Sequence, residues 1–166
     1  MSKLQLKKEL ASLTREQLIQ VVLDAYSARK ETKEYFEFFL NPDVDALHEK
    51  YMRVVGKELL RNKHYHSKAR ATVVRRAIRD FASFDPGPEF VLAFMLDVLK
   101  AAIARSSFVY YTEAFNNGVA RLIDDIIAFA DKNAMIDRAL SSLRALAADE
   151  KLGHANYRNF YLARFL

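Results

Sequence analysis

Apolar side chains recur with the helical period along almost the whole chain, and no segment shows a convincing strand alternation. Leu4, Leu6 and Leu10 predict a short opening helix over residues 3–11. Thr14, followed three residues later by Gln17, predicts a capping box at the start of the next helix. Only a narrow polar stripe interrupts the apolar surface of that second helix, so we expect it to have neighbours on two sides.

The segment "KEYFEFFLNPD" (residues 33–43) is the most aromatic part of the chain. On a helix its aromatic and leucine side chains cover an arc of about 200°, which predicts a place in the hydrophobic core. Asn41 should end this helix, because a residue that precedes proline is disfavoured in helical geometry. Pro42 can then begin the next helix at its first position.

The rest of the chain continues as helices joined by short turns. The spacing predicts helices over residues 42–62, 67–84, 88–106, 112–131, 134–151 and 154–165. Gly56 marks a close helix crossing or a bend. We therefore predict an all-α fold: a single domain, residues 1–166, of about eight helices packed as antiparallel pairs, a pattern that also permits a short α-solenoid-like array. "DPGP" at residues 85–88 is a tight turn between two helical halves of this domain.

The composition narrows the classes of protein. The chain has 166 residues, of which 51% are hydrophobic and 28% charged, as in globular proteins. It has no Cys, which excludes disulfides, zinc sites with thiolate ligands and cysteine nucleophiles. The most apolar stretch, residues 90–104, is interrupted by Asp97 and Lys100 and falls short of the ~20 apolar residues of a membrane span. With no apolar signal region near the start, we expect a cytoplasmic protein.

Positive charge is concentrated in one segment. The whole chain carries +5, yet residues 50–79 hold ten Lys or Arg against one acid, Glu58, so the remainder is net negative. On a helix from residue 67 to 84, the cations from Lys68 to Arg79 share a stripe that points away from the core, whereas Arg70 should reach past the core to solvent or to a carboxylate. We name seven residues the basic ridge: Lys57, Arg61, Lys63, Lys68, Arg75, Arg76 and Arg79.

The basic ridge has two main interpretations. It could contact phosphates in a way that is independent of nucleic-acid sequence and strongly dependent on salt. The simpler interpretation is a solvated helix face, since no recognised nucleic-acid-binding motif accompanies it. A basic amphipathic helix could also lie on an anionic membrane surface or in a groove of a partner protein.

No metal, cofactor or catalytic site is predicted. His64 and His66 have a spacing that two metal ligands could use, but a third ligand is lacking and cations surround the pair. Asp124 and Asp125 are explained by a solvated polar helix face, and Ser106 and Ser107 have no nearby base. Because the chain also has no glycine-rich phosphate loop, we do not expect an enzyme.

Three blocks, "EQLIQVVLDAY", "KEYFEFFLNPD" and "RRAIRDFASFDPGPE" followed by a Met-Leu pair, occur in this order. In these blocks the chain resembles a family of small uncharacterised bacterial helical proteins, a domain of unknown function. The phrase around Asn41, Pro42 and Asp43 is its most specific element. The resemblance covers most of the chain and implies a helical fold and a bacterial cytoplasmic setting, but no activity. The resemblance does not extend to the Arg-rich filling between the blocks or to His64 and His66.

The sequence thus favours a non-enzymatic helical interaction module whose partner is another protein. The alternative is nucleic-acid or anion binding through the basic ridge. The oligomeric state and the identity of the partner have no signature in the sequence.

Overall fold

The structure, a computed structural model, describes residues 2–166 and confirms the all-α fold class. These residues form nine α-helices, a two-stranded hairpin and a terminal 3₁₀ helix. The helices divide into two compact units, one that ends at Asp43 and one that begins at Val44. Within residues 2–166, no helix combines the length and the hydropathy that a bilayer crossing requires.

Three helices make up the first unit: α1 (Lys3–Ala11), α2 (Arg15–Ala28) and α3 (Lys30–Leu40). The predicted capping box is confirmed at the start of α2. The Gln17 backbone N–H donates to Thr14 Oγ1 at 3.2 Å, and the Thr14 backbone N–H donates to Gln17 Oε1 at 2.9 Å. These two bonds satisfy donors that a helix start leaves free, which explains why α2 begins after Thr14.

The first unit has no fully buried side chain among its described residues. The prediction that the aromatic segment of residues 33–43 is core is therefore wrong: Phe39 is 66% exposed and Leu40 is 79% exposed. The reason is that α2 and α3 pack through a thin layer, in which the rings of Tyr26 and Phe36 lie 6.5 Å apart. Two short helices enclose one edge of an aromatic cluster and leave the other edge in solvent.

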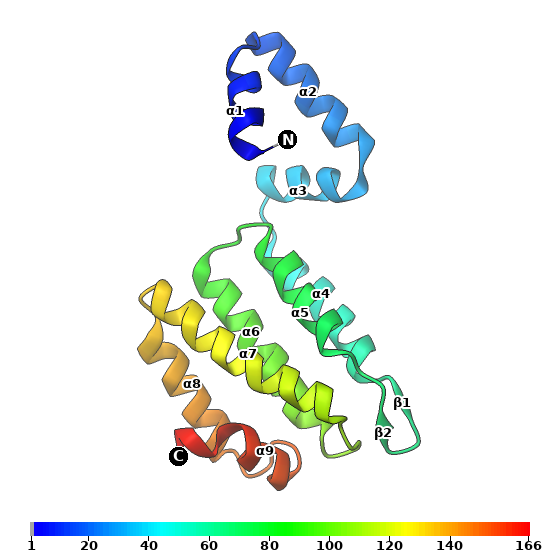
Figure 1. The fold of residues 1–166 in the computed structure, drawn as a ribbon, viewed down its shortest axis with the longest axis vertical. Helices are drawn as coiled ribbons and strands as arrows, with labels where there is room; N and C mark the ends of the chain where they lie inside the picture. Colours follow the sequence, from blue (N-terminus) through cyan, green and yellow to red (C-terminus); the bar gives the residue numbers. More distant parts are fainter. Residues whose placement is uncertain (1) are drawn as a thin grey trace. The chain divides into compact units, whose positions relative to one another are not determined.

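The second unit is a bundle around α6 (Figure 1). Its helices are α4 (Val44–Leu59), α5 (Ala71–Ala82), α6 (Pro88–Arg105), α7 (Glu113–Lys132), α8 (Ile136–Ala148) and α9 (Ala155–Leu162), followed by the 3₁₀ helix η1 (Ala163–Phe165). The central helix α6 contacts α4, α5, α7 and α8. It is apolar on most sides, as expected of a helix with neighbours all around it.

Aromatic and aliphatic side chains fill the core of this bundle. Phe81 of α5 and Phe94 of α6 are fully buried and stack with their ring centroids 4.4 Å apart. The turn at residues 85–88 lies within this unit and joins α5 to α6. Gly87 has φ +112°, a backbone conformation that favours glycine, and Pro88 is the first residue of α6.

A short β-hairpin replaces the predicted ends of two helices. Strands β1 (Asn62–Lys63) and β2 (His66–Ser67) pair antiparallel, with His64 at φ +52° in the turn. The predicted helices over 42–62 and 67–84 are thus too long, because α4 ends at Leu59 and α5 begins at Ala71. The segment between them is mostly polar. A helix there would have little apolar surface to pack against the bundle, and such packing provides most of the stability of a helix in a protein.

The hairpin is also attached to a segment far away in the sequence. The Ser67 backbone N–H donates to the Tyr110 carbonyl at 2.9 Å, and the Tyr110 N–H donates to the Tyr65 carbonyl at 2.6 Å. Such a contact between segments more than forty residues apart leaves no trace in local periodicity.

The structure contradicts the prediction for Pro42 and one of the two alternatives for Gly56. Pro42 lies in the link between α3 and α4 rather than at the first position of a helix. Gly56 marks no close crossing, because a Cβ atom placed there would meet nothing within 4 Å. The close approach is at Gly118 of α7, where an added Cβ would collide with the side chain of Ala71 on α5.

Candidate functional site

The structure distributes the basic ridge over three places in the second unit. Lys57 is on α4, three cations (Arg61, Lys63 and Lys68) are in or next to the hairpin, and three (Arg75, Arg76 and Arg79) are on α5. Lys68 precedes the first residue of α5, so it does not share the helical stripe that its spacing predicted. The ridge is therefore not one continuous helix face.

Glu58, the one acid of residues 50–79, forms ion pairs with two cations, Arg61 and Arg70. The guanidinium of Arg70 donates to Glu58 through Nε at 2.9 Å and through Nη2 at 3.0 Å, and the Arg70 backbone N–H donates at 2.8 Å. Arg61 adds a bond through Nη1 at 2.9 Å. The expectation that Arg70 reaches a carboxylate is thereby confirmed. These bonds, from Arg70 first, lower the pKa of the buried Glu58 carboxyl from 4.5 to about 2, against the opposing effect of burial.

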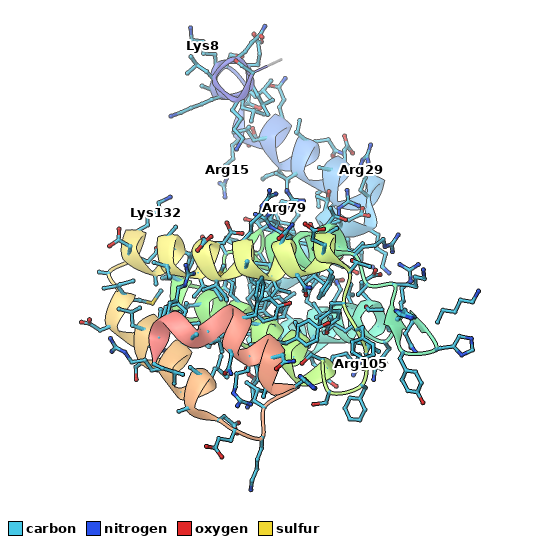
Figure 2. All side chains as sticks on the ribbon, turned by 60° about the horizontal axis from the view of Figure 1, so that its bottom comes forward. Lys8, Arg15, Arg29, Arg79, Arg105 and Lys132 are labelled. Carbon is cyan, nitrogen blue, oxygen red and sulfur yellow. The ribbon has the colours of Figure 1, made fainter. Side chains whose placement is uncertain are left out.

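Arg75 also has a structural partner. Its Nη2 donates to Asp125 Oδ2 of α7 at 2.7 Å, an ion pair that links two helices. Arg75 and Arg79 line a mostly apolar groove of about 330 Å³ between α5, α6 and α7. In residues 2–166, Arg76 and Arg79 form no ion pair with a carboxylate, so these two keep the free charge of α5. Figure 2 shows Arg79 next to α7, and Arg105 toward the hairpin end of this unit.

The histidines lie in different surroundings. His48 Nε2 is 3.0 Å from Asp97 Oδ2, and its ring packs edge-on against Phe94. His64 and His66 are exposed on the hairpin. In the part of the chain that the structure describes, no three His, Cys, Asp or Glu side chains are grouped so that they could hold a metal ion.

The residues considered for catalysis have structural contacts. Asp124 accepts a hydrogen bond from Arg164 at 2.8 Å, and Asp125 is the partner of Arg75. Ser106 is buried; its hydroxyl donates to the Ile103 carbonyl at 2.6 Å and accepts from the His154 backbone N–H at 3.0 Å. These bonds fix the end of α6 to the start of α9, and the hydroxyl proton is donated to a backbone carbonyl.

A cavity of about 420 Å³ opens at the hairpin end of the second unit. Its walls come from the hairpin turn, from the link between α6 and α7, and from α9. Five aromatic side chains line it: Tyr65, Phe108, Tyr110, Tyr157 and Phe160. We call it the aromatic cavity. Its volume lies within the range typical of small-molecule sites, which is roughly 300–1,000 Å³.

Hydrogen bonds fix the frame of the aromatic cavity. Tyr157 Oη accepts from the Tyr111 backbone N–H at 2.9 Å, and Tyr161 Oη donates to Asn116 Oδ1 at 2.5 Å. Burial raises the pKa of the Tyr111 and Tyr161 hydroxyls above its ordinary value, so both remain protonated donors. His154 Nδ1 accepts from the Asn156 N–H at 3.2 Å, which places the proton of a neutral ring on Nε2. The frame is thus preorganised.

The sequence patterns did not predict the aromatic cavity. The sequence feature that could have indicated it is three short segments in which aromatic residues have polar neighbours. They are Tyr65 between two histidines, "SSFVYY" at residues 106–111, and "NYRNFY" at residues 156–161. Such rings outside the main apolar periodicity are candidates for a surface function. Only the folded chain shows that the three segments share one cavity.

Comparison with known proteins gives a family without an assigned activity. A family model described as a family of unknown function, DUF6155, matches residues 1–161. No curated protein and no solved structure matches the chain. The match confirms the resemblance to a family of unknown function.

Proposed function

Since the chain belongs to the family of unknown function DUF6155, matched over residues 1–161, we propose that it is a non-enzymatic interaction module of the cytoplasm that binds a protein partner through its first unit. The observation that supports this proposal is the exposed apolar surface of that unit. Nine large apolar side chains are exposed there: Leu4, Leu6, Ile19, Val21, Val22, Leu23, Tyr35, Phe39 and Leu40. A concentration of this kind in so short a segment is typical of protein-binding surfaces.

The spacing of these side chains suits recognition by another protein. Ile19, Val22 and Leu23 lie at positions i, i+3 and i+4 of α2, which places them on one face. Phe36, Phe39 and Leu40 repeat the same spacing on α3. This is the pattern with which amphipathic helices enter apolar grooves.

The charge of the first unit supports a protein partner rather than a polyanion. Residues 1–43 contain seven Lys or Arg and seven Asp or Glu, so the segment is electrically neutral. A neutral apolar surface gains binding energy from desolvation, and it offers no excess of cations to phosphates.

The test is a pull-down from cell extract with the full chain as bait, with and without nuclease. The double variant Ile19→Ser/Leu23→Ser should lose a protein that the wild type retains after nuclease, because it removes two apolar anchors. Leu60→Ser is the matched control, since Leu60 is similarly exposed but lies in the second unit. Capture that is unchanged in the double variant, or that vanishes with nuclease, would contradict the proposal. Circular dichroism of each variant checks that the helices are intact.

A second candidate function is sequence-independent binding of nucleic acid through the basic ridge. It is supported by the free guanidinium groups of Arg76 and Arg79 on α5. Retention of the protein on a nucleic-acid column should fall steeply between low and moderate salt. The variant Arg76→Glu/Arg79→Glu should abolish this retention. Arg75 is left unchanged in that variant, because a carboxylate at this position would face Asp125 and disturb the contact between α5 and α7. Affinity that survives the reversals would exclude the ridge.

A further inference from the structure

We propose that the aromatic cavity binds a nucleobase, and that the cations next to it hold the phosphate of the same nucleotide. This inference concerns the hairpin end of the second unit and is independent of the protein-binding surface of the first unit. It rests on three features of the cavity: its aromatic walls, its hydrogen-bonding groups and the charge around it.

The aromatic walls are exposed to solvent. Tyr65 is 72% exposed, Phe108 67% and Phe160 65%, although they come from three different segments. One exposed ring on a surface is ordinary, but five aromatic residues around one cavity form a surface on which a planar ring can stack. Every base has such a planar face, so stacking suits nucleotides without selecting one sequence.

The polar groups of the cavity match the edge of a base. Asn116 uses its Oδ1 to accept the Tyr161 hydroxyl, which leaves its NH₂ group to donate. His154 uses Nδ1 to accept the Asn156 N–H, which leaves Nε2–H to donate. Ring nitrogens and carbonyl oxygens on base edges accept such bonds. Among the described residues that line the cavity there is no carboxylate to repel a phosphate.

Positive charge is next to the aromatic walls. The guanidinium carbon of Arg105 lies 5.6 Å from the centre of the Phe108 ring, and Arg105 Nε is buried without a hydrogen-bond acceptor in the described part of the chain. Lys63 is exposed on the hairpin that carries Tyr65. The same charges disfavour a quaternary ammonium, the other common guest of aromatic cages. A base attached to an anion therefore fits the cavity best.

The experiment is calorimetric titration of the full chain with AMP, adenosine, ribose 5-phosphate and inorganic phosphate. In parallel, the anisotropy of a fluorescent eight-nucleotide oligo(A) RNA is measured. AMP and the RNA should bind, adenosine more weakly, and ribose 5-phosphate and phosphate weakest of all. Binding of AMP and RNA with similar affinity indicates a free nucleotide as the natural ligand. Binding of the RNA alone indicates a base within a single strand, and both results support the site.

The test variant is Phe108→Ala/Phe160→Ala, which removes two exposed rings and leaves the buried core and the Tyr157 hydrogen bond unchanged. Its affinity for AMP, or for the RNA, should fall about tenfold or more, given the usual contribution of base stacking. Phe39→Ala is the matched control: that ring is 66% exposed but lies in the first unit, so affinity should be unchanged. Lys63→Glu should lower the affinity for AMP more than the affinity for adenosine.

Three outcomes would overturn the proposal. One is the absence of binding by AMP and by the RNA at about 1 mM, the weak end of specific recognition. Another is equal affinity for AMP and ribose 5-phosphate, which would show that only the anion is bound. The third is RNA binding that the double Phe variant retains and that Arg76→Glu/Arg79→Glu abolishes, because the basic ridge would then be the site.

Discussion

At the scale of the residue, Glu58 connects the two ends of the segment that carries the hairpin. It is the only acid among ten cations in residues 50–79, and it is buried between the end of α4 and the start of α5. Three of its hydrogen bonds come from Arg70 and one from Arg61. The side chain therefore fixes both ends of the segment that carries the hairpin.

We predict that Glu58→Gln lowers the free energy of unfolding by about 2 kcal/mol at pH 7, because it weakens charge-assisted hydrogen bonds at a buried position. Urea denaturation of the wild type and the variant measures this difference. Glu49→Gln is the control, since Glu49 pairs with Arg53 on the exposed surface of α4 and should change stability by about 0.5 kcal/mol or less. Equal effects of the two substitutions would contradict the central role of Glu58.

The difference between wild type and Glu58→Gln should also depend on pH. The pKa of Glu58 is about 2 in the folded protein and lies near the ordinary value of 4.5 in the unfolded chain. The ionised carboxylate therefore stabilises the folded state fully above pH 4.5, and this stabilisation is lost as the pH falls toward 2. Urea midpoints over this range should converge as the solution is acidified, and a constant difference would contradict the low pKa.

At the scale of the element, two glycines with opposite surroundings give a paired prediction. Gly56→Ala should stabilise the protein by about 0.5–1 kcal/mol, because α4 gains helix propensity and the new methyl group meets open space. Gly118→Ala should destabilise it by about 1–3 kcal/mol, because the methyl group collides with Ala71 and separates α7 from α5. Thermal unfolding of both variants measures the two signs. A rise in the melting temperature for both would show that the contact at Gly118 relaxes.

Helix positions were predictable where local chemistry determines them. The opening helix over residues 3–11 and the helix that starts after Thr14 agree with α1 and α2, since their apolar spacing and caps are local. Pro88 likewise begins α6 as the sequence indicated. The hairpin was not predictable in this way, because its strands have two residues each and depend on hydrogen bonds to Tyr110. Long-range contacts of this kind decide the local structure of short polar segments.

In the candidate sites, too, local features could be predicted from the sequence, and features that depend on long-range contacts could not. The excess of charge could be counted from the sequence, but the partner of Arg75 could not be predicted, because Asp125 is fifty residues from Arg75. The aromatic cavity combines segments that begin near residues 65, 106 and 154, so only the fold brings its walls together. Periodicity predicted which rings could be buried but could not predict that Tyr35 and Phe39 of α3 remain exposed.

For the whole molecule, the distribution of buried side chains predicts unequal stability of the two units. Every fully buried side chain among the described residues lies at or beyond Leu47. We expect a fragment of residues 44–166 to unfold cooperatively, with the helix content of its unit, and a fragment of residues 1–43 to be largely unfolded alone. Circular dichroism with heating of both fragments tests this. A stable helical fold of residues 1–43 in isolation would contradict this prediction, because it would show that the thin apolar layer between α2 and α3 is enough to keep the unit folded.

The attachment of the hairpin to Tyr110 has a consequence for how the chain can vary. Both backbone groups of one residue are committed to the hairpin, the N–H to Tyr65 and the carbonyl to Ser67. An inserted or deleted residue in either segment would shift the register and break both bonds together. Changes of length in the two segments are therefore coupled, and a change accepted in one requires a compensating change in the other.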